Sequence, residues 1–84
     1  MSYQVLIRSS AEKEMDALPR AAHARISAKI SSLAKNPRPS GCKKLTGTDG
    51  YRIRAGDYRV IYTIDDKIVL VTVVGVGHRR EVYR

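Results

Sequence analysis

The segment from Tyr51 to Tyr62 constrains the fold of this chain more than any other stretch. Polar and apolar residues alternate on both sides of Gly56-Asp57, and this pattern predicts a β-hairpin. A two-residue turn with glycine first sets the register of the arms and places Arg54 directly opposite Arg59. The other strands and helices of the domain must therefore pack against a hairpin whose register is already set.

Side chains along a strand point alternately to the two faces of a sheet, so the hairpin has two chemically different faces. The apolar face, expected to join the core, carries Tyr51, Ile53, Val60 and Tyr62. The other face carries Arg52, Arg54 and Arg59. Like charges directly opposite one another on a sheet are unfavourable. The arginine cluster is therefore interpreted either as a phosphate-binding site or as a solvated basic face.

Two helices are predicted before the hairpin. A strand over residues 3–8 leads to Ser9, which with Glu12 matches a capping box, and the first helix is expected to end at Pro19. The second helix is predicted over Pro19–Lys35 and stops at Asn36-Pro37. Its basic residues, expected on a solvated polar face, are Arg20, Arg25, Lys29 and Lys35.

Strands dominate the remainder of the chain. A short strand is predicted over Cys42–Thr46, and the most apolar strand, Lys67–Gly75, is expected inside the sheet. A two-residue turn at Asp65-Asp66 would place Thr72 across from Arg59. The predicted fold class is α+β, with one domain over residues 1–84. Its order is β-α-α-β-β-β, and the helices are expected to cover one face of a mainly antiparallel sheet.

The net charge of the chain limits the classes of partner that it is expected to bind. Sixteen Lys and Arg residues against eight Asp and Glu give a formal net charge of +8, which suggests nucleic acid, an anionic membrane surface or an acidic protein partner. No apolar run reaches transmembrane length, and no signal peptide is visible, so a cytoplasmic protein without membrane association is expected. Cys42 is the single cysteine, and the two histidines are far apart. We therefore expect no metal site and no cofactor.

Short motifs in this order resemble the RelE/ParE superfamily of bacterial toxin–antitoxin modules, in particular its RelE branch. The resemblance spans essentially the whole chain. Its motifs are Asn36-Pro37 after the helical pair, Lys44-Leu45-Thr46-Gly47, Tyr51-Arg52-Ile53-Arg54, the segment Gly56–Tyr62, and the ending Val76–Tyr83. The resemblance implies a RelE-like fold and a ribosome-dependent endoribonuclease, an mRNA interferase that is metal-independent. It also implies a cognate antitoxin as partner and the ribosome and messenger RNA as targets, and it leaves open that the toxin–antitoxin complex binds its promoter DNA.

Residue roles follow from the resemblance by position. Arg59 corresponds to the strand arginine that contacts the scissile phosphate, and Arg79 corresponds to a second phosphate-contacting arginine after the last strand. Tyr83 corresponds to a tyrosine that stacks on the substrate base and is a candidate for proton transfer. Arg52 and Arg54 stand where the best-known member has lysines. With these two residues, the expected catalytic residues are Arg52, Arg54, Arg59, Arg79 and Tyr83. Further RNA contacts are expected from Lys43, Lys44, His78 and Arg80.

The two arginines in place of lysines leave the general base open. Arginine stays protonated in proteins, so Arg52 and Arg54 keep an electrostatic role only. Tyr83 and His78 are the candidate bases. Two rival functions also stay open: a ParE-like inhibitor that binds DNA gyrase without cutting RNA, and a non-catalytic nucleic-acid-binding module or decayed toxin.

Overall fold

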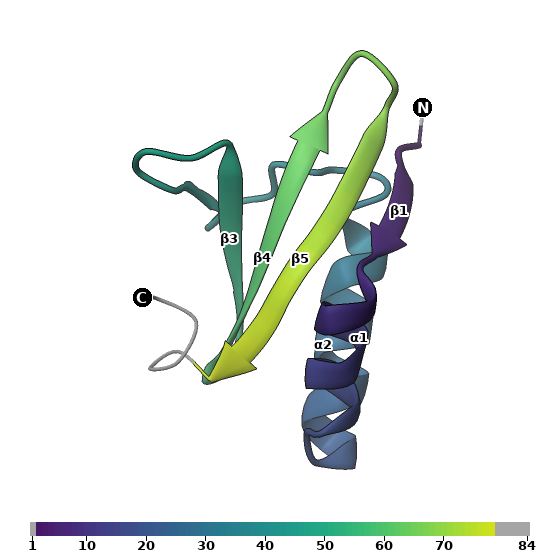
Figure 1. Cartoon of the computed structure of the whole chain (residues 1–84), viewed down its shortest axis with the longest axis vertical. Helices are drawn as coiled ribbons and strands as arrows, with labels where there is room; N and C mark the ends of the chain where they lie inside the picture. Colours follow the sequence, from purple (N-terminus) through teal and green to yellow (C-terminus); the bar gives the residue numbers. More distant parts are fainter. Residues whose placement is uncertain (1, 79–84) are drawn as a thin grey trace.

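A computed structural model describes residues 2–78 and shows two helices on one side of a five-stranded sheet (Figure 1). The elements are β1 (Gln4–Ile7), α1 (Ser9–Asp16), α2 (Arg20–Ser32), β2 (Lys43–Lys44), β3 (Gly50–Ala55), β4 (Tyr58–Asp65) and β5 (Leu70–His78). The strand order is β1-β5-β4-β3-β2, and only the β1–β5 pair is parallel among these described strands. The predicted α+β class is confirmed. The strand predicted over Cys42–Thr46 corresponds to β2, a short edge strand that the order β-α-α-β-β-β did not count.

The β3–β4 hairpin has the predicted register. Arg54 lies opposite Arg59 and Ile53 lies opposite Val60. Gly56 begins the turn with a φ of 65°, a backbone conformation that glycine adopts without steric cost. The pattern of the two arms and the turn chemistry agree, so local sequence alone determined this part of the fold.

The core lies between the helices and one face of the sheet. From α1 it takes Ala11 and Met15, and from α2 it takes Ile26 and Ile30. Leu33, directly after α2, also belongs to it, and the sheet contributes Ile53, Ala55, Val60, Tyr62, Val71, Val73 and Val76. The sheet residues occupy the face opposite the arginines, as the alternation predicted. The most apolar strand, β5, lies between β1 and β4, which confirms its interior position.

The predicted register between β4 and β5 is wrong. Asp65 still belongs to β4, where it pairs with Leu70, and its Oδ1 accepts hydrogen bonds from the backbone N–H groups of Lys67 and Ile68. The turn therefore spans residues 66–69 instead of two residues. An irregularity next to Ile61 shifts the register again, so that Gly77 rather than Thr72 lies opposite Arg59.

The helix boundaries also differ from the sequence prediction. Ser9 is already helical, and Arg8 occupies the N-cap position without a side-chain hydrogen bond, so the predicted capping box does not form. The first helix ends at Asp16, before Pro19, because a residue preceding proline is disfavoured in helical conformation. Leu18 lies beyond that end and is only half-buried.

A polar cluster ties three distant segments together at one end of the sheet. The Arg38 guanidinium binds Asp66 through Nη1 at 3.3 Å and Nη2 at 2.9 Å, and the Tyr3 hydroxyl donates to Asp66 at 2.7 Å. The hydrogen bonds from Arg38 and Tyr3 lower the pKa of the Asp66 carboxyl. Arg38 also lies over the Tyr51 ring at 5.3 Å from its centroid. The cluster joins β1, the α2–β2 loop and the β4–β5 turn.

Candidate functional site

Three arginines share the sheet face that faces away from the helices. We call Arg52, Arg54 and Arg59 the arginine face, and the pairing of β3 with β4 places them there. Arg52 is only 6% exposed, Arg59 is half-buried and Arg54 is exposed. None of the described helices lies on this face, and its three arginines differ in how far they are exposed.

The two β2 lysines fall on opposite faces. Lys43 lies opposite Arg52 in the β2–β3 pair and therefore shares its face. Lys44 lies opposite Tyr51, donates from Nζ to the Thr48 carbonyl oxygen at 3.0 Å, and lies 5.6 Å from the centroid of the Tyr51 ring. The structure thus joins Lys43, but not Lys44, to the arginine face.

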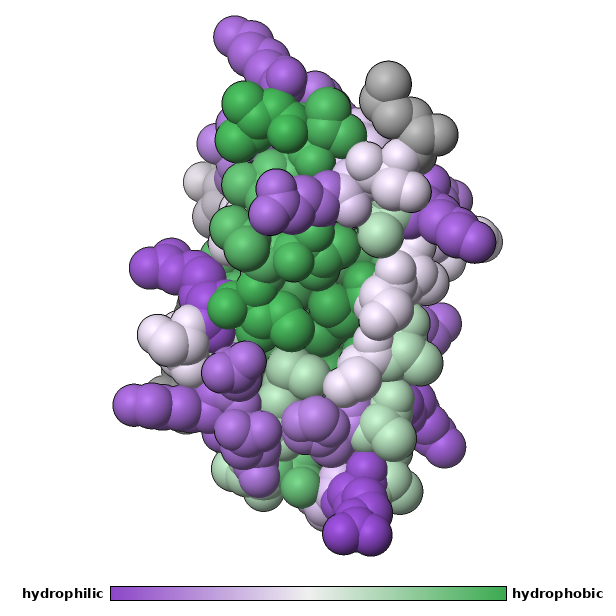
Figure 2. All heavy atoms as spheres, turned by 90° about the vertical axis from the view of Figure 1, so that its right-hand side faces the viewer, coloured by the Kyte–Doolittle hydropathy of each residue, from purple (hydrophilic) through white to green (hydrophobic). Residues whose placement is uncertain are grey.

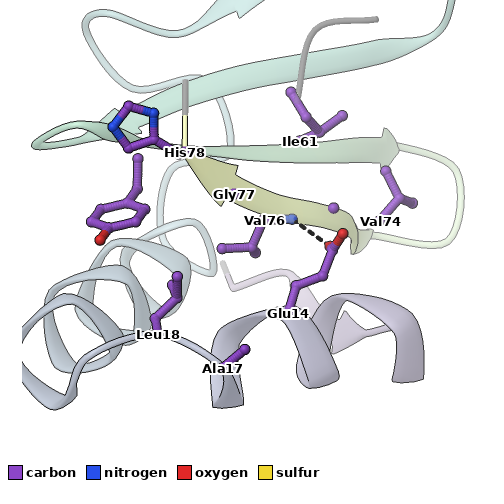
Figure 3. A pocket seen from close by; sticks show the side chains of 10 residues that line it. Glu14, Ala17, Leu18, Ile61, Val74, Val76, Gly77 and His78 are labelled. Carbon is purple, nitrogen blue, oxygen red and sulfur yellow. Dashed lines mark hydrogen bonds between the residues drawn. The ribbon is translucent and has the colours of Figure 1, made fainter. Parts of the chain in front are cut away.

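His78 ends β5 on the helix-facing side. It pairs with Tyr58, and the two rings meet edge to face with centroids 5.8 Å apart. By register His78 and Arg59 point to opposite faces of the sheet. His78 lines a pocket of about 920 Å³ beside the end of α1 (Figure 3). The other lining residues are Glu14, Ala17, Leu18, Tyr58, Ile61, Val74, Gly75, Val76 and Gly77.

Within this pocket Glu14 completes the edge of β5. β1 pairs with β5 only as far as Val73, so the edge of β5 beyond that point has no neighbouring strand among residues 2–78. The Glu14 Oε1 atom accepts a hydrogen bond from the Val76 backbone N–H at 2.9 Å, as Figure 3 shows. A side chain of α1 therefore satisfies a backbone donor that a strand would otherwise bind.

The predicted residues of the C-terminal segment lie outside the described part of the chain. These are Arg79, Arg80 and Tyr83. Their roles stay predictions. The described chain reaches His78, the last residue of β5, and Gly77 lies directly opposite Arg59.

A cleft of about 410 Å³ at the outer edge of β3 was not predicted from the sequence. Its lining combines Lys29 and Ser32 from α2 with Pro39, Ser40 and Gly41 from the following loop, and with Lys43, Arg52, Ile53 and Arg54 from the sheet. Lys29 was expected on a solvated helix face. Only the packing of α2 beside β3 reveals its position, because no local pattern relates these two segments.

The arginine face is suited to binding phosphate. Guanidinium groups present planar arrays of donors that match phosphate oxygens, and they stay charged at physiological pH. Within residues 2–78, no group of three or more His, Cys, Asp or Glu side chains could hold a metal ion. The positively charged side chains that the strand pairing places on this face are Arg52, Arg54, Arg59 and Lys43.

A second surface has a different character. Seen from the side on which β1 lies in Figure 1, the molecule carries a continuous hydrophobic area bordered by hydrophilic side chains (Figure 2). Large hydrophobic residues exposed in the described chain are Leu6, at 48%, and Ile68, at 64%. The outer edge of β1 also lacks a neighbouring strand in the described sheet. None of the described helices is long and apolar enough to cross a membrane.

The fold and the arginine face define a small basic α+β domain with three arginines on one face of its sheet. A family model described as the ParE toxin of the type II toxin–antitoxin system, parDE, matches residues 5–83. Toxin RelG of Mycobacterium tuberculosis is 32% identical over 88 residues, which cover 100% of this chain and 99% of that toxin. Toxin RelE of the same organism is 32% identical, over 98% of this chain and 87% of its own length.

Solved structures agree with these relatives. The archaeal RelE–RelB complex from Pyrococcus horikoshii matches with a TM-score of 0.85 and 33% identity, covering 96% of this chain and 99% of that one. The isolated RelE toxin of Escherichia coli matches with a TM-score of 0.79 and 31% identity, covering 98% of this chain and 92% of that one. The chain belongs to the RelE/ParE family of type II toxins, and its fold is RelE-like.

Proposed function

We propose that this toxin is a ribosome-dependent endoribonuclease that cleaves messenger RNA in the ribosomal A site and so inhibits translation. The observation that supports this function best is the placement of Arg52, Arg54 and Arg59 together on the face of the sheet that points away from the helices. The similarity to RelE and RelG toxins over the full chain supports the same branch.

The chemistry is an internal attack within the RNA strand. The 2′-oxygen forms a bond to the adjacent phosphorus, and the bond from phosphorus to the 5′-oxygen of the next nucleotide breaks. The products are a 2′,3′-cyclic phosphate and a 5′-hydroxyl. Arg59 donates to the phosphate oxygens as negative charge develops, and loss of one such donor typically lowers a rate by about 10²–10³-fold. Arg52 and Arg54 deepen the positive field around it.

Proton transfer in this proposal belongs to residues other than the arginines, since guanidinium groups do not deprotonate in proteins. His78 lies on the helix-facing side of β5, away from Arg59. The proposal therefore assigns stacking on the substrate base and proton transfer to Tyr83, and a second phosphate contact to Arg79. Arginine supplies the positive charge, so cleavage is expected to persist in the presence of a metal chelator.

A cognate antitoxin is the proposed protein partner. The hydrophobic area and the outer edge of β1, which pairs with no other strand of the described sheet, offer a docking surface for a partner segment (Figure 2). The net charge of +8 favours an acidic partner. The E. coli RelBE complex, whose matched chain is 30% identical to this one with a TM-score of 0.78, was crystallised with its antitoxin. Binding of the present toxin–antitoxin complex to promoter DNA stays a prediction.

A ParE-like activity is the second candidate, because the matching family model carries the ParE description. In that case the toxin would bind DNA gyrase and leave RNA intact. Controlled expression in a bacterial host, followed by separate labelling of new protein and new DNA, distinguishes the two. The RelE-like function predicts an immediate loss of protein synthesis with new ends in messenger RNA. Continued translation with halted DNA synthesis would instead support gyrase binding.

A further inference from the structure

The outer edge of β3 is only partly covered by its neighbour. β2 pairs with Tyr51 and Arg52 and no further, so the edge from Ile53 to Ala55 has no neighbouring strand in the described chain. The cleft of about 410 Å³ opens at this edge, and we call it the β3-edge cleft. Its walls are α2, the loop at residues 39–41 and the strand edge.

Every charged side chain that lines this cleft in the described structure is positive. Lys29 comes from the last turn of α2, Lys43 from β2, and Arg52 and Arg54 from β3. Lys29 and Lys43 belong to two different elements, so positive charge reaches the cleft from the helix as well as from the sheet. Four converging cations therefore favour an anionic occupant.

The volume of the cleft and its hydrogen-bond donors indicate which class of ligand it could bind. A volume of about 410 Å³ falls within the range of sites for small organic ligands, roughly 300–1,000 Å³, and exceeds what a lone ion requires. Ser40, which also lines the cleft, adds a hydroxyl donor. A phosphate with its attached sugar matches both the donors and the volume.

The cleft is also continuous with the arginine face. Arg54 lines the cleft and lies directly opposite Arg59 across the β3–β4 pair. One RNA strand can therefore contact Arg59 with one phosphate and the cleft with another. Two fixed phosphate contacts on the same strand restrict its path, and this restriction holds the attacked linkage in position.

We propose that the β3-edge cleft is a second RNA phosphate site, in which Lys29 and Lys43 hold a backbone phosphate next to the one that meets Arg59. This inference rests on the proposed RNA-directed function. The bound phosphate belongs either to the messenger RNA or to ribosomal RNA, which share the same backbone chemistry.

The test uses a fluorescent RNA oligonucleotide with 2′-O-methyl groups, which cannot be cleaved, so binding is measured apart from catalysis. The variant is Lys29→Ala with Lys43→Ala, and the control is Lys13→Ala with Lys35→Ala, two lysines outside the cleft lining. Both variants lose the same charge, and circular dichroism checks that they fold. The cleft variant is expected to bind roughly tenfold more weakly. The slope of its log affinity against log salt concentration should become shallower by about 0.7 for each phosphate that the variant no longer neutralises.

Ribosome co-sedimentation separates the two sources of phosphate. Weaker binding of the free oligonucleotide assigns the cleft to single-stranded RNA, and a defect confined to ribosome co-sedimentation assigns it to ribosomal RNA; both support the site. Equal affinities of the cleft and control variants in both assays would overturn it. RNA binding that depends on the cleft, together with no cleavage of messenger RNA on ribosomes by the wild type, would support the cleft as an RNA site. The same result would refute the proposed nuclease activity.

Discussion

Arg54 and Arg59 lie directly opposite each other across the β3–β4 pair, on the face of the sheet that no described helix covers. Like charges in this arrangement destabilise a sheet. The Arg54–Arg59 pair therefore adds a repulsive contribution at the place where the proposed ligand would bind. Under the proposed function, a phosphate between the two guanidinium groups would reduce their mutual repulsion.

The variant Arg54→Thr is expected to raise the free energy of unfolding while weakening RNA binding. Removing one of two opposed charges and introducing a β-branched residue should contribute about 0.5 kcal/mol at low salt. The gain should shrink in high salt, where the repulsion is already screened. Urea unfolding at low and high salt measures both values. A lower stability of the variant at low salt would contradict this account of the arginine pair.

Tyr62 connects the core to the loop after α2. Its hydroxyl donates to the Pro37 carbonyl oxygen at 2.7 Å, and the whole side chain is buried. Tyr62→Phe leaves that carbonyl without its donor and is expected to cost about 1–3 kcal/mol in the free energy of unfolding. Tyr51→Phe is the matched control, because within residues 2–78 the Tyr51 hydroxyl accepts an exposed hydrogen bond from Arg38 Nε at 3.4 Å, and this bond is longer and more solvated than that of Tyr62. Similar losses for both variants would refute the assigned role.

Glu14 is expected to protect the open edge of β5. Glu14→Ala removes the acceptor of the Val76 N–H and should lower the free energy of unfolding by roughly 1–2 kcal/mol. Hydrogen exchange at the Val76 amide, followed by NMR, should accelerate in the same variant. Glu14→Gln keeps an oxygen acceptor and should retain most of the protection. Unchanged exchange in Glu14→Ala would show that this edge needs no acceptor from α1.

The Asp66 carboxylate is expected to make the free energy of unfolding depend on pH. Hydrogen bonds from Arg38 and Tyr3 lower its pKa in the folded state, so its contribution is present above the unfolded value of about 3.9. That contribution is lost as the pH falls through the lowered folded value. Wild type should therefore unfold at higher urea concentration than Asp66→Asn at pH about 7, and the difference should shrink toward pH about 2. A difference independent of pH would contradict the assignment.

The hairpin and the fold class could be predicted because local signals determine them. Alternation on both sides of Gly56 set the register that puts Arg54 opposite Arg59. The β4–β5 register could not be predicted in the same way. Its turn depends on the Asp65 carboxylate accepting two backbone N–H groups, and an irregularity inside the strand pair adds a further shift. The apolar pattern of β5 shows neither the longer turn nor the irregularity, so the sequence alone could not reveal them.

The candidate site likewise combines features that local sequence determines with features that only the tertiary structure determines. Arg52, Arg54 and Arg59 share a face because strand alternation requires it. The position of His78 on the helix-facing side depends on the irregularity in β4–β5, so sequence reasoning left it open as a base. Lys29 joins the β3-edge cleft through the packing of α2 against the sheet, which only the tertiary structure determines.

Cleavage of a defined messenger RNA on purified ribosomes tests the central claim most directly. Wild type and Arg59→Ala are compared on ribosomes stalled at one codon, with free RNA as the control, and the new ends are mapped. The account predicts cuts by the wild type at a fixed position in the A-site codon, and a rate lower by about 10²-fold or more for folded Arg59→Ala. An equally active Arg59→Ala variant, or no cuts from folded wild type, would contradict it.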